Sequence, residues 1–287
     1  MNKKRLTTTL ATSLLVVAGC SSGGSGAADT GIPEDAFAIV ANADLAVGPQ
    51  RLLVGLATTD ADSYAAPDLS VEIDLYPPDS TEPSISVPGV FIWTTPEVRG
   101  LYRAQVDFDV SGTWRVSVHT GDVGTPTEPT PFNVAEDGLT PGVGDPALPV
   151  STPVAVNPDE IAEISTDTTP DPRFYMVSLD DAIDSGSPTV VVFATPAFCE
   201  TATCGPMLDT VNEISPDYPD VTFIHVEVYE NLDATSREEL RLVEAVEAWN
   251  LPSEPWVFVI DGVGVVTAKF EGTVDSQELQ QAVEDLT

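Results

Sequence analysis

Residues 189–207 read TVVVFATPAFCETATCGPM. The apolar run from Thr189 to Ala194 predicts a strand that is buried on both faces, as the strands of parallel sheets are. Cys199 and Cys204 follow, five positions apart, and Gly-Pro comes directly after the second cysteine. Apolar residues then recur at helical spacing from Met207 to Ile214. The stretch therefore predicts a strand, a loop that carries two cysteines, and a helix.

Whether the two cysteines can join depends on where this helix begins. Within one continuous helix, residues five apart have Cα atoms roughly 8–9 Å apart, beyond the ~7 Å limit for a disulfide. A bridge therefore requires Cys199 to lie in the loop before the helix. Pro206 favours the first helical position, which puts Cys204 at the helix entrance, where unpaired N–H groups and the dipole favour a thiolate. This geometry permits a bridge without demanding one.

The chain after Arg173 alternates strands with helices. In order, we expect a short helix at 179–183, a strand at 189–194, a helix from 207 to 214, a strand at 221–229, a helix at 236–250, strands at 256–261 and 263–270, and a helix from 276. From the first strand onward the order is β-α-β-α-β-β-α. That order predicts an α/β domain over residues 173–287.

Two segments of this region resemble the signatures of thioredoxin-like proteins. TVVVFAT, then Cys199, then Cys204-Gly-Pro resembles the strand and loop in which that family carries Trp-Cys-Gly-Pro-Cys. NLPSEPWVFVIDG, at residues 250–262, resembles the family's second signature, a cis-proline before a strand that faces the cysteines. The resemblance implies a thioredoxin-like fold and thiol–disulfide exchange through Cys199 and Cys204. It also implies substrate binding by Pro255 and by the backbone of Glu254.

The two cysteines have different expected roles. Cys204 is favoured as the attacking thiolate because of its place at the helix entrance, with Cys199 as the resolving cysteine. The opposite assignment stays open, because Phe198-Cys199 also resembles the family's Trp-Cys. The loop departs from the family pattern, since Met207 stands where the second cysteine belongs and the spacing is C-x4-C. The apolar run also lacks the buried carboxylate that many thioredoxins use for proton transfer, and Glu200 disfavours a thiolate.

Two other uses of the cysteine pair stay open. A structural disulfide that closes so short a loop stabilises a protein modestly. A Cu(I) site would combine Cys199 and Cys204 with His225 or Met207, because thiolate and thioether ligands suit this ion. His225 lies mid-strand among apolar neighbours, which is more typical of a packing residue, and Met207 is expected to pack in the helix interface. We therefore expect no metal and no cofactor.

The chain before these elements has a different pattern. From residue 36 to residue 135, apolar and polar residues alternate with period two, and Pro-Pro, Pro-Gly and Ser-Gly turns separate the runs. This predicts an antiparallel β-sandwich. GLYRAQVDFDVSGTWRVSVHT, at residues 100–120, resembles a late hairpin of immunoglobulin-like extracytoplasmic modules. Residues 136–172 are rich in Pro, Asp and Thr with little periodicity, so we expect an extended linker there.

The N-terminus resembles that of bacterial lipoproteins. Residues 1–19 combine three basic residues with a short apolar core, which predicts an export signal. Val-Ala-Gly before Cys20 resembles a lipobox, which implies that Cys20 is lipidated and becomes the mature first residue. Residues 20–35 are small and polar, as expected of a flexible tether. The lipid is then the expected membrane anchor, and the folded chain is expected on the extracytoplasmic face.

Charge and cysteine usage narrow the function. The chain has 11 Lys and Arg against 46 Asp and Glu, a formal charge of −35, which excludes nucleic acid as a partner. If Cys20 carries lipid, Cys199 and Cys204 are the remaining pair of the 3 cysteines, and outside the cytoplasm such a pair is oxidised or cycles. We expect thiol–disulfide exchange with extracytoplasmic proteins. The alternative is a non-enzymatic binding or copper-handling lipoprotein whose cysteines staple a loop or bind Cu(I).

Overall fold

The computed structural model describes residues 32–33, 35–60, 63–121 and 125–286. The predicted export signal and Cys20 lie outside these residues. In the described ranges the strands form two sheets, one of seven strands and one of four. No helix in those ranges is both long enough and apolar enough to cross a bilayer.

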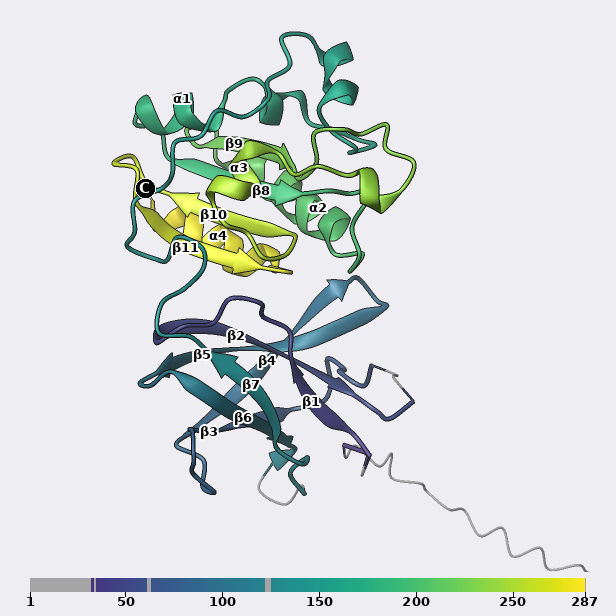
Figure 1. Cartoon of the computed structure of the whole chain (residues 1–287), viewed down its shortest axis with the longest axis vertical. Coiled ribbons are helices and arrows are strands. Elements are labelled where there is room, and N and C mark those ends of the chain that lie inside the picture. Colours follow the sequence, from purple (N-terminus) through teal and green to yellow (C-terminus); the bar gives the residue numbers. More distant parts are fainter. Residues whose placement is uncertain (1–31, 34, 61–62, 122–124, 287) are drawn as a thin grey trace, which may run out of the picture. The chain divides into compact units, whose positions relative to one another are not determined.

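The first sheet is antiparallel and contains all the strands between residues 37 and 134 that the structure describes (Figure 1). Its strands are β1 (Phe37–Val40), β2 (Gly48–Ala57), β3 (Val71–Tyr76), β4 (Ile85–Thr95), β5 (Arg99–Phe108), β6 (Gly112–His119) and β7 (Thr130–Val134). Their order is β1-β2-β5-β4-β3-β6-β7. The period-two pattern thus predicted strands in this region correctly, and the alternation is clearest in the second half of β5, where Ala104, Val106 and Phe108 are buried and Gln105 and Asp107 are exposed.

Strand β4 joins two groups of strands. Its residues Ile85–Gly89 pair with β3, and Val90–Thr95 pair with β5. A core cluster that includes Trp114 and Tyr102, both fully buried, packs on these strands. The last and first parts of the sheet also meet, because Ala135, which follows β7, forms a parallel bridge with Ala46, which lies just before β2. The sheet is therefore strongly curled and barrel-like, and its immunoglobulin-like character stays a prediction.

The second sheet has the order β11-β10-β8-β9. Its strands are β8 (Thr189–Ala194), β9 (Thr222–Glu227), β10 (Trp256–Ile260) and β11 (Val266–Glu271), and its helices are α1 (Leu179–Asp184), α2 (Cys204–Ile214), α3 (Glu244–Ala248) and α4 (Ser276–Glu284). Strands β8 and β9 are parallel, whereas β10 runs antiparallel to both β8 and β11. The element order agrees with the one predicted from the sequence.

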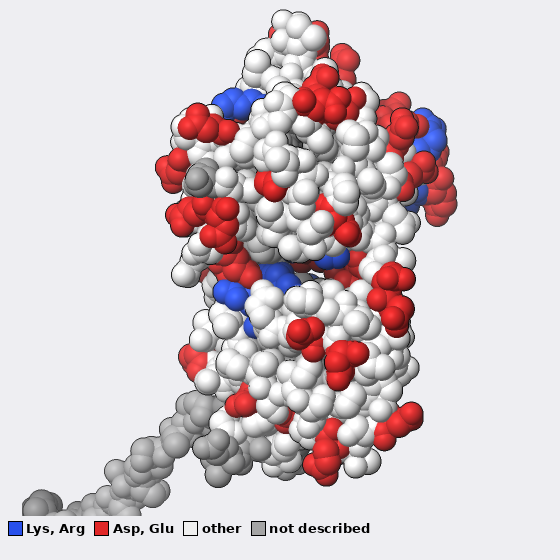
Figure 2. Space-filling model, turned by 90° about the vertical axis from the view of Figure 1, so that its left-hand side faces the viewer, with Lys and Arg blue, Asp and Glu red and all other residues white. Residues whose placement is uncertain are grey.

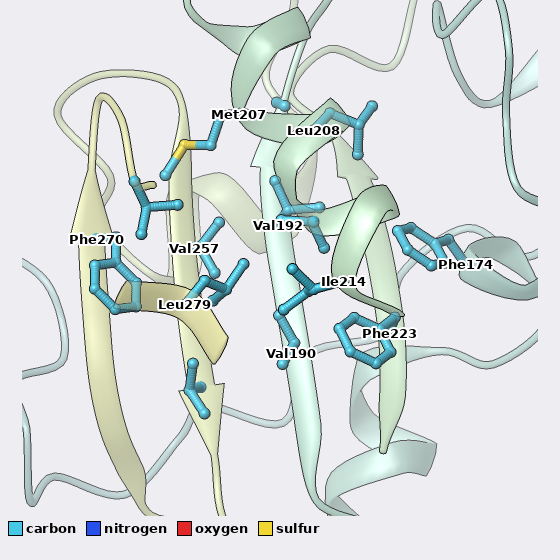
Figure 3. Close-up of a cluster of buried hydrophobic side chains, with 14 of the residues drawn as sticks. Phe174, Val190, Val192, Met207, Leu208, Ile214, Phe223, Val257, Phe270 and Leu279 are labelled. Atoms are coloured by element: carbon cyan, nitrogen blue, oxygen red, sulfur yellow. The ribbon is translucent and has the colours of Figure 1, made fainter. Parts of the chain in front are cut away.

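Both faces of the second sheet are buried. In β8, Val190 and Val192 point into one core cluster, together with residues of α2 and α4 (Figure 3). Val191 and Phe193 point into the opposite cluster, which includes residues of α1 and α3. All six residues of β8 are buried, which is why its sequence is a continuous apolar run rather than an alternating one. Because β8 is packed on both faces, it fixes the position of the cysteine loop that follows it.

The segment 136–172 differs from the extended linker that we expected. Ala147 belongs to the core cluster beside α1, and Ala155 and Ile161 belong to the cluster beside α2. A short 3-10 helix, η2 (Pro158–Glu163), lies within the segment, and a second, η3 (Pro172–Tyr175), begins at its end. Isolated apolar residues spaced along a polar chain carry no periodicity, so this packing was not predictable from the local pattern. Where the domains divide stays a prediction.

The helix expected at 236–250 is wrong. The chain instead forms a single 3-10 turn, η5 (Arg237–Glu239), and the short helix α3. Between them Leu240 has an extended backbone, and Leu242 bridges to Tyr229. The backbone N–H of Val243 donates to Val228 O. Pairing with the chain beyond β9 overrides local helical propensity in this segment.

Candidate functional site

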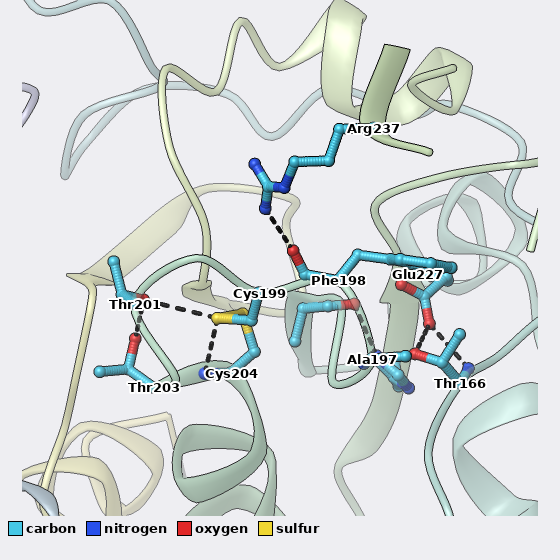
Figure 4. The surroundings of a disulfide bond; sticks show 11 residues. Thr166, Ala197, Phe198, Cys199, Thr201, Thr203, Cys204, Glu227 and Arg237 are labelled. Carbon is cyan, nitrogen blue, oxygen red and sulfur yellow. Dashed lines mark hydrogen bonds between the residues drawn. A yellow bond between two sulfur atoms is a disulfide. The ribbon is translucent and has the colours of Figure 1, made fainter. Parts of the chain in front are cut away.

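Cys199 and Cys204 form a disulfide at the carboxyl end of β8 (Figure 4). Their Cα atoms are 6.1 Å apart, within the range that a disulfide spans. Cys199 lies in the loop and Cys204 is the first residue of α2, as the spacing required. Helix α2 begins at Cys204, so Pro206 occupies its third position and not the first, and a backbone N–H there also has no partner within the helix.

The two sulfur atoms have different surroundings. Cys204 is fully buried and belongs to the core cluster on the α2 face, whereas Cys199 is partly exposed. The backbone N–H of Cys204 donates to the Cys199 Sγ at 3.3 Å, and the Thr201 hydroxyl lies 3.4 Å from the same sulfur. The first amide of α2 therefore points at Cys199. A thiolate there would be stabilised by the helix N-terminus, while a thiolate at Cys204 would be desolvated.

Arg237 holds the loop from outside. Its guanidinium donates to Phe198 O at 2.6 Å and forms an ion pair with Glu200, so it grips the residues on both sides of Cys199 (Figure 4). Both charged side chains of the ion pair are largely exposed, so the pair itself adds little stability. Its effect is positional. The sequence did not single out Arg237, because it lies 38 residues after Cys199 within the segment expected to be a helix.

Glu227 holds the same loop from inside. This carboxylate is 4% exposed and lies at the end of β9, beside Ala194 in the parallel register. Its Oε2 accepts from the backbone N–H and the hydroxyl of Thr166, at 2.8 and 2.7 Å. The Thr166 hydroxyl in turn accepts from the N–H of Ala197 at 3.1 Å. A buried carboxylate thus lies beside the cysteine loop, but on the neighbouring strand β9 and not in the apolar run of β8.

His225 is a packing residue. Its Nδ1 lies 2.7 Å from the Tyr175 hydroxyl, and its Nε2 lies 3.1 Å from Ala194 O. Met207, also considered as a copper ligand, is 1% exposed in the core cluster beside α2. Among the described residues, no group of three His, Cys, Asp or Glu side chains is arranged to hold a metal ion. His225 is therefore not placed with Cys199 and Cys204 in such a group.

The burial of His225 makes folding stability depend on pH. Desolvation lowers its pKa below the usual value, and the charge of Glu227 and the Ala194 carbonyl oppose this only in part. The unfolded chain therefore binds the proton first. We expect His225 to contribute a loss of stability as pH falls below about 6.5, with a slope of at most about 1.4 kcal/mol per pH unit.

Urea unfolding of the wild type and of His225→Asn at pH 7.5, 6.5 and 5.5 measures how the free energy of unfolding depends on pH. Carboxyl groups with raised pKa values, such as Glu254 and Glu271, are present in both proteins, so their contributions cancel in the difference. The stability advantage of the wild type should shrink as pH falls. An advantage that stays constant or grows would show that His225 does not remain neutral in the folded protein.

Pro255 follows a cis peptide bond after Glu254, as the sequence predicted. The buried Pro255 accepts a hydrogen bond at its carbonyl from Gly272 N–H, at 2.9 Å. Trp256, the next residue, pairs with Phe193 in the antiparallel register of β10 and β8. Continuing that register puts Pro255 across from Ala194, at the same end of the sheet as the cysteine loop. The predicted part of Glu254 and Pro255 in binding a substrate stays a prediction.

With this geometry described, the chain can be compared with known proteins. No family model and no curated protein matches the sequence. A solved structure assigned as the thiol:disulfide interchange protein DsbE from Chlorobium tepidum is 15% identical, with a TM-score of 0.35, over 51% of this chain and 99% of that one. The Lin-41 filamin domain is 15% identical, with a TM-score of 0.23, over 37% of this chain and 98% of that one. At such scores neither likeness contributes to the argument below.

Proposed function

We propose that this chain is a membrane-anchored extracytoplasmic protein that exchanges disulfides with other proteins through Cys199 and Cys204. The observation that carries the proposal is the environment of the disulfide. A partly exposed sulfur accepts from the first amide of α2 and is joined to a fully buried one. In such a pair the partly exposed sulfur can react with a sulfur of the partner, and the buried sulfur can then displace the partner from it. A loop held by Arg237 and Glu227 keeps the exposed sulfur in place.

The contrast between the cysteines supports Cys199 as the attacking residue, the reverse of the assignment favoured from the sequence. In the reduced protein the Cys199 thiolate attacks a partner disulfide, forms a mixed disulfide, and releases one partner thiolate. Cys204 loses its proton and attacks the Cys199 sulfur, which restores the Cys199–Cys204 disulfide and releases the second partner thiolate. Two electrons pass from this protein to the partner. The reverse sequence oxidises a partner dithiol.

The proposed location follows from the N-terminal sequence alone. A basic, apolar and lipobox-like order before Cys20 supports export and lipidation, with residues 20–35 as a tether. Outside the cytoplasm, disulfides form and persist, which agrees with a chain whose cysteines beyond Cys20 are joined. The partners would then be thiols or disulfides of extracytoplasmic proteins.

Reduction potential and turnover together test the function. The potential of the Cys199–Cys204 couple is measured by equilibration with dithiol buffers and alkylation of the free thiols. Reduction of a model protein disulfide is measured for the wild type and for the variant with both cysteines replaced by serine. We expect a potential above about −300 mV and turnover that the double variant lacks. A lower potential together with equal rates would make the disulfide a structural staple and reject the proposal.

A further inference from the structure

Glu254 lies at the end of the second sheet that carries the cysteine loop. Strands β10 and β8 pair up to Trp256 and Phe193, so Glu254, two residues before Trp256, and Thr195, two residues after Phe193, lie at the same end of the sheet. Arg237 donates to Phe198 O, the Tyr229 ring packs edge-on against the Phe198 ring, and the charge of Glu254 acts on both Arg237 and Tyr229. The side chain that precedes the cis-proline therefore interacts with the two side chains that contact Phe198, the residue before Cys199.

The Glu254 carboxylate is free to accept hydrogen bonds from a partner. It is half-buried, and it makes no hydrogen bond with the residues that the structure describes. Burial raises its pKa above the usual value, and the charge of Arg237 offsets this only in part. A desolvated carboxylate without hydrogen bonds gains more from an incoming cation than an exposed one does.

Glu254 forms no ion pair with the residues that the structure describes. Arg237 already donates to Phe198 O and pairs with Glu200. Tyr229, on which the charges of Glu254 and the buried Glu227 both act, supplies no positive charge, and neither does Glu271, which accepts from the hydroxyl of the adjacent Ser253. The protein as a whole has a formal charge of −35, and acidic side chains spread over the face in Figure 2 while basic ones are sparse. Among the described residues, Arg237 is therefore the one cation whose charge acts on Glu254, and the acidic field of the protein attracts basic partners.

We propose that Glu254 selects partner segments in which a lysine or arginine lies beside the reacting cysteine. The inference rests on the proposed function, because it names the substrates of that same site. In the exchange, the Cys199 thiolate attacks the partner sulfur while the partner's cation pairs with the Glu254 carboxylate. The pairing involves no electron transfer. It lowers the free energy of the mixed disulfide and of the transition state that leads to it.

Two synthetic peptides test the inference. Each carries one intramolecular disulfide, and they differ only in whether lysines or glutamates flank the cysteines. Rate constants for their reduction by the dithiol form of the protein are measured by acid quenching and alkylation. We expect wild-type protein to prefer the lysine peptide, and Glu254→Gln to lower that preference by about fivefold. Glu254→Lys should lower it further.

Glu82→Gln is the matched control, because it changes the net charge equally in the turn between β3 and β4. It should keep the wild-type preference. Equal reduction of both peptides by wild type, or a preference that survives Glu254→Gln, would overturn the inference and leave the proposed function standing. If wild type reduces neither peptide faster than the variant without both cysteines, the proposed function fails and the inference fails with it.

Discussion

Cys199→Ser should abolish disulfide exchange, whereas Cys204→Ser should stop the reaction at the mixed disulfide. Without the Cys199 sulfur, the remaining thiol is fully buried and cannot meet a partner. Without Cys204, the partly exposed Cys199 still attacks, but nothing displaces the partner from it. We expect exchange with a model protein disulfide to fall about 100-fold or more in both variants. Only Cys204→Ser should accumulate a covalent adduct, visible on a non-reducing gel and removed by dithiothreitol.

The variant with both cysteines replaced gives the baseline for adduct formation. Thr201→Val removes the hydroxyl near the Cys199 sulfur but keeps both thiols. It should retain most of the activity, because the Cys204 N–H still points at that sulfur. If Cys199→Ser forms the adduct and Cys204→Ser does not, Cys204 is the attacking residue. That outcome would support the role favoured from the helix entrance alone.

The site was predictable to the extent that it lies in one stretch of sequence. The apolar strand, the two cysteines and the helix are consecutive, so spacing and helix geometry placed Cys199 in the loop and Cys204 at the helix entrance. The relative burial of the two sulfurs was not predictable, because it depends on what packs over α2. Helix-terminus electrostatics favoured Cys204, yet the same N-terminal amide donates to the Cys199 sulfur.

The side chains that hold the loop come from distant parts of the chain. Glu227 lies on the neighbouring strand, and it reaches Ala197 through Thr166, from a segment without periodicity. Arg237 comes from a segment whose composition favours helix but whose backbone pairs with the end of β9. Local pattern cannot reveal such contacts, because each depends on how separate segments meet in three dimensions. The exact match of β8 with its apolar run shows the opposite case, in which burial alone determines the element.

Phe258→Ala should cause a large loss of stability. Phe258 is fully buried in β10, and its ring centroid lies 4.7 Å from that of Trp249 and 5.7 Å from that of Trp256. Removing the ring loses its burial and leaves a cavity between rigid aromatic neighbours. We expect the free energy of unfolding to fall by about 3–5 kcal/mol and the Tm by roughly 10 °C. Urea denaturation followed by tryptophan fluorescence measures the change.

Val263→Ala provides the control, because Val263 is 84% exposed in the turn between β10 and β11 and should change stability by less than about 0.5 kcal/mol. Phe258 and Cys204 belong to core clusters on opposite faces of the sheet. Folded Phe258→Ala protein should therefore exchange disulfides within about twofold of the wild-type rate, because a cavity on one face leaves contacts on the other intact. A much larger loss of exchange in protein that is still folded would mean that the aromatic layer positions Pro255, which adjoins Trp256 in the chain. The role of the layer would then extend from stability to the geometry of the redox site.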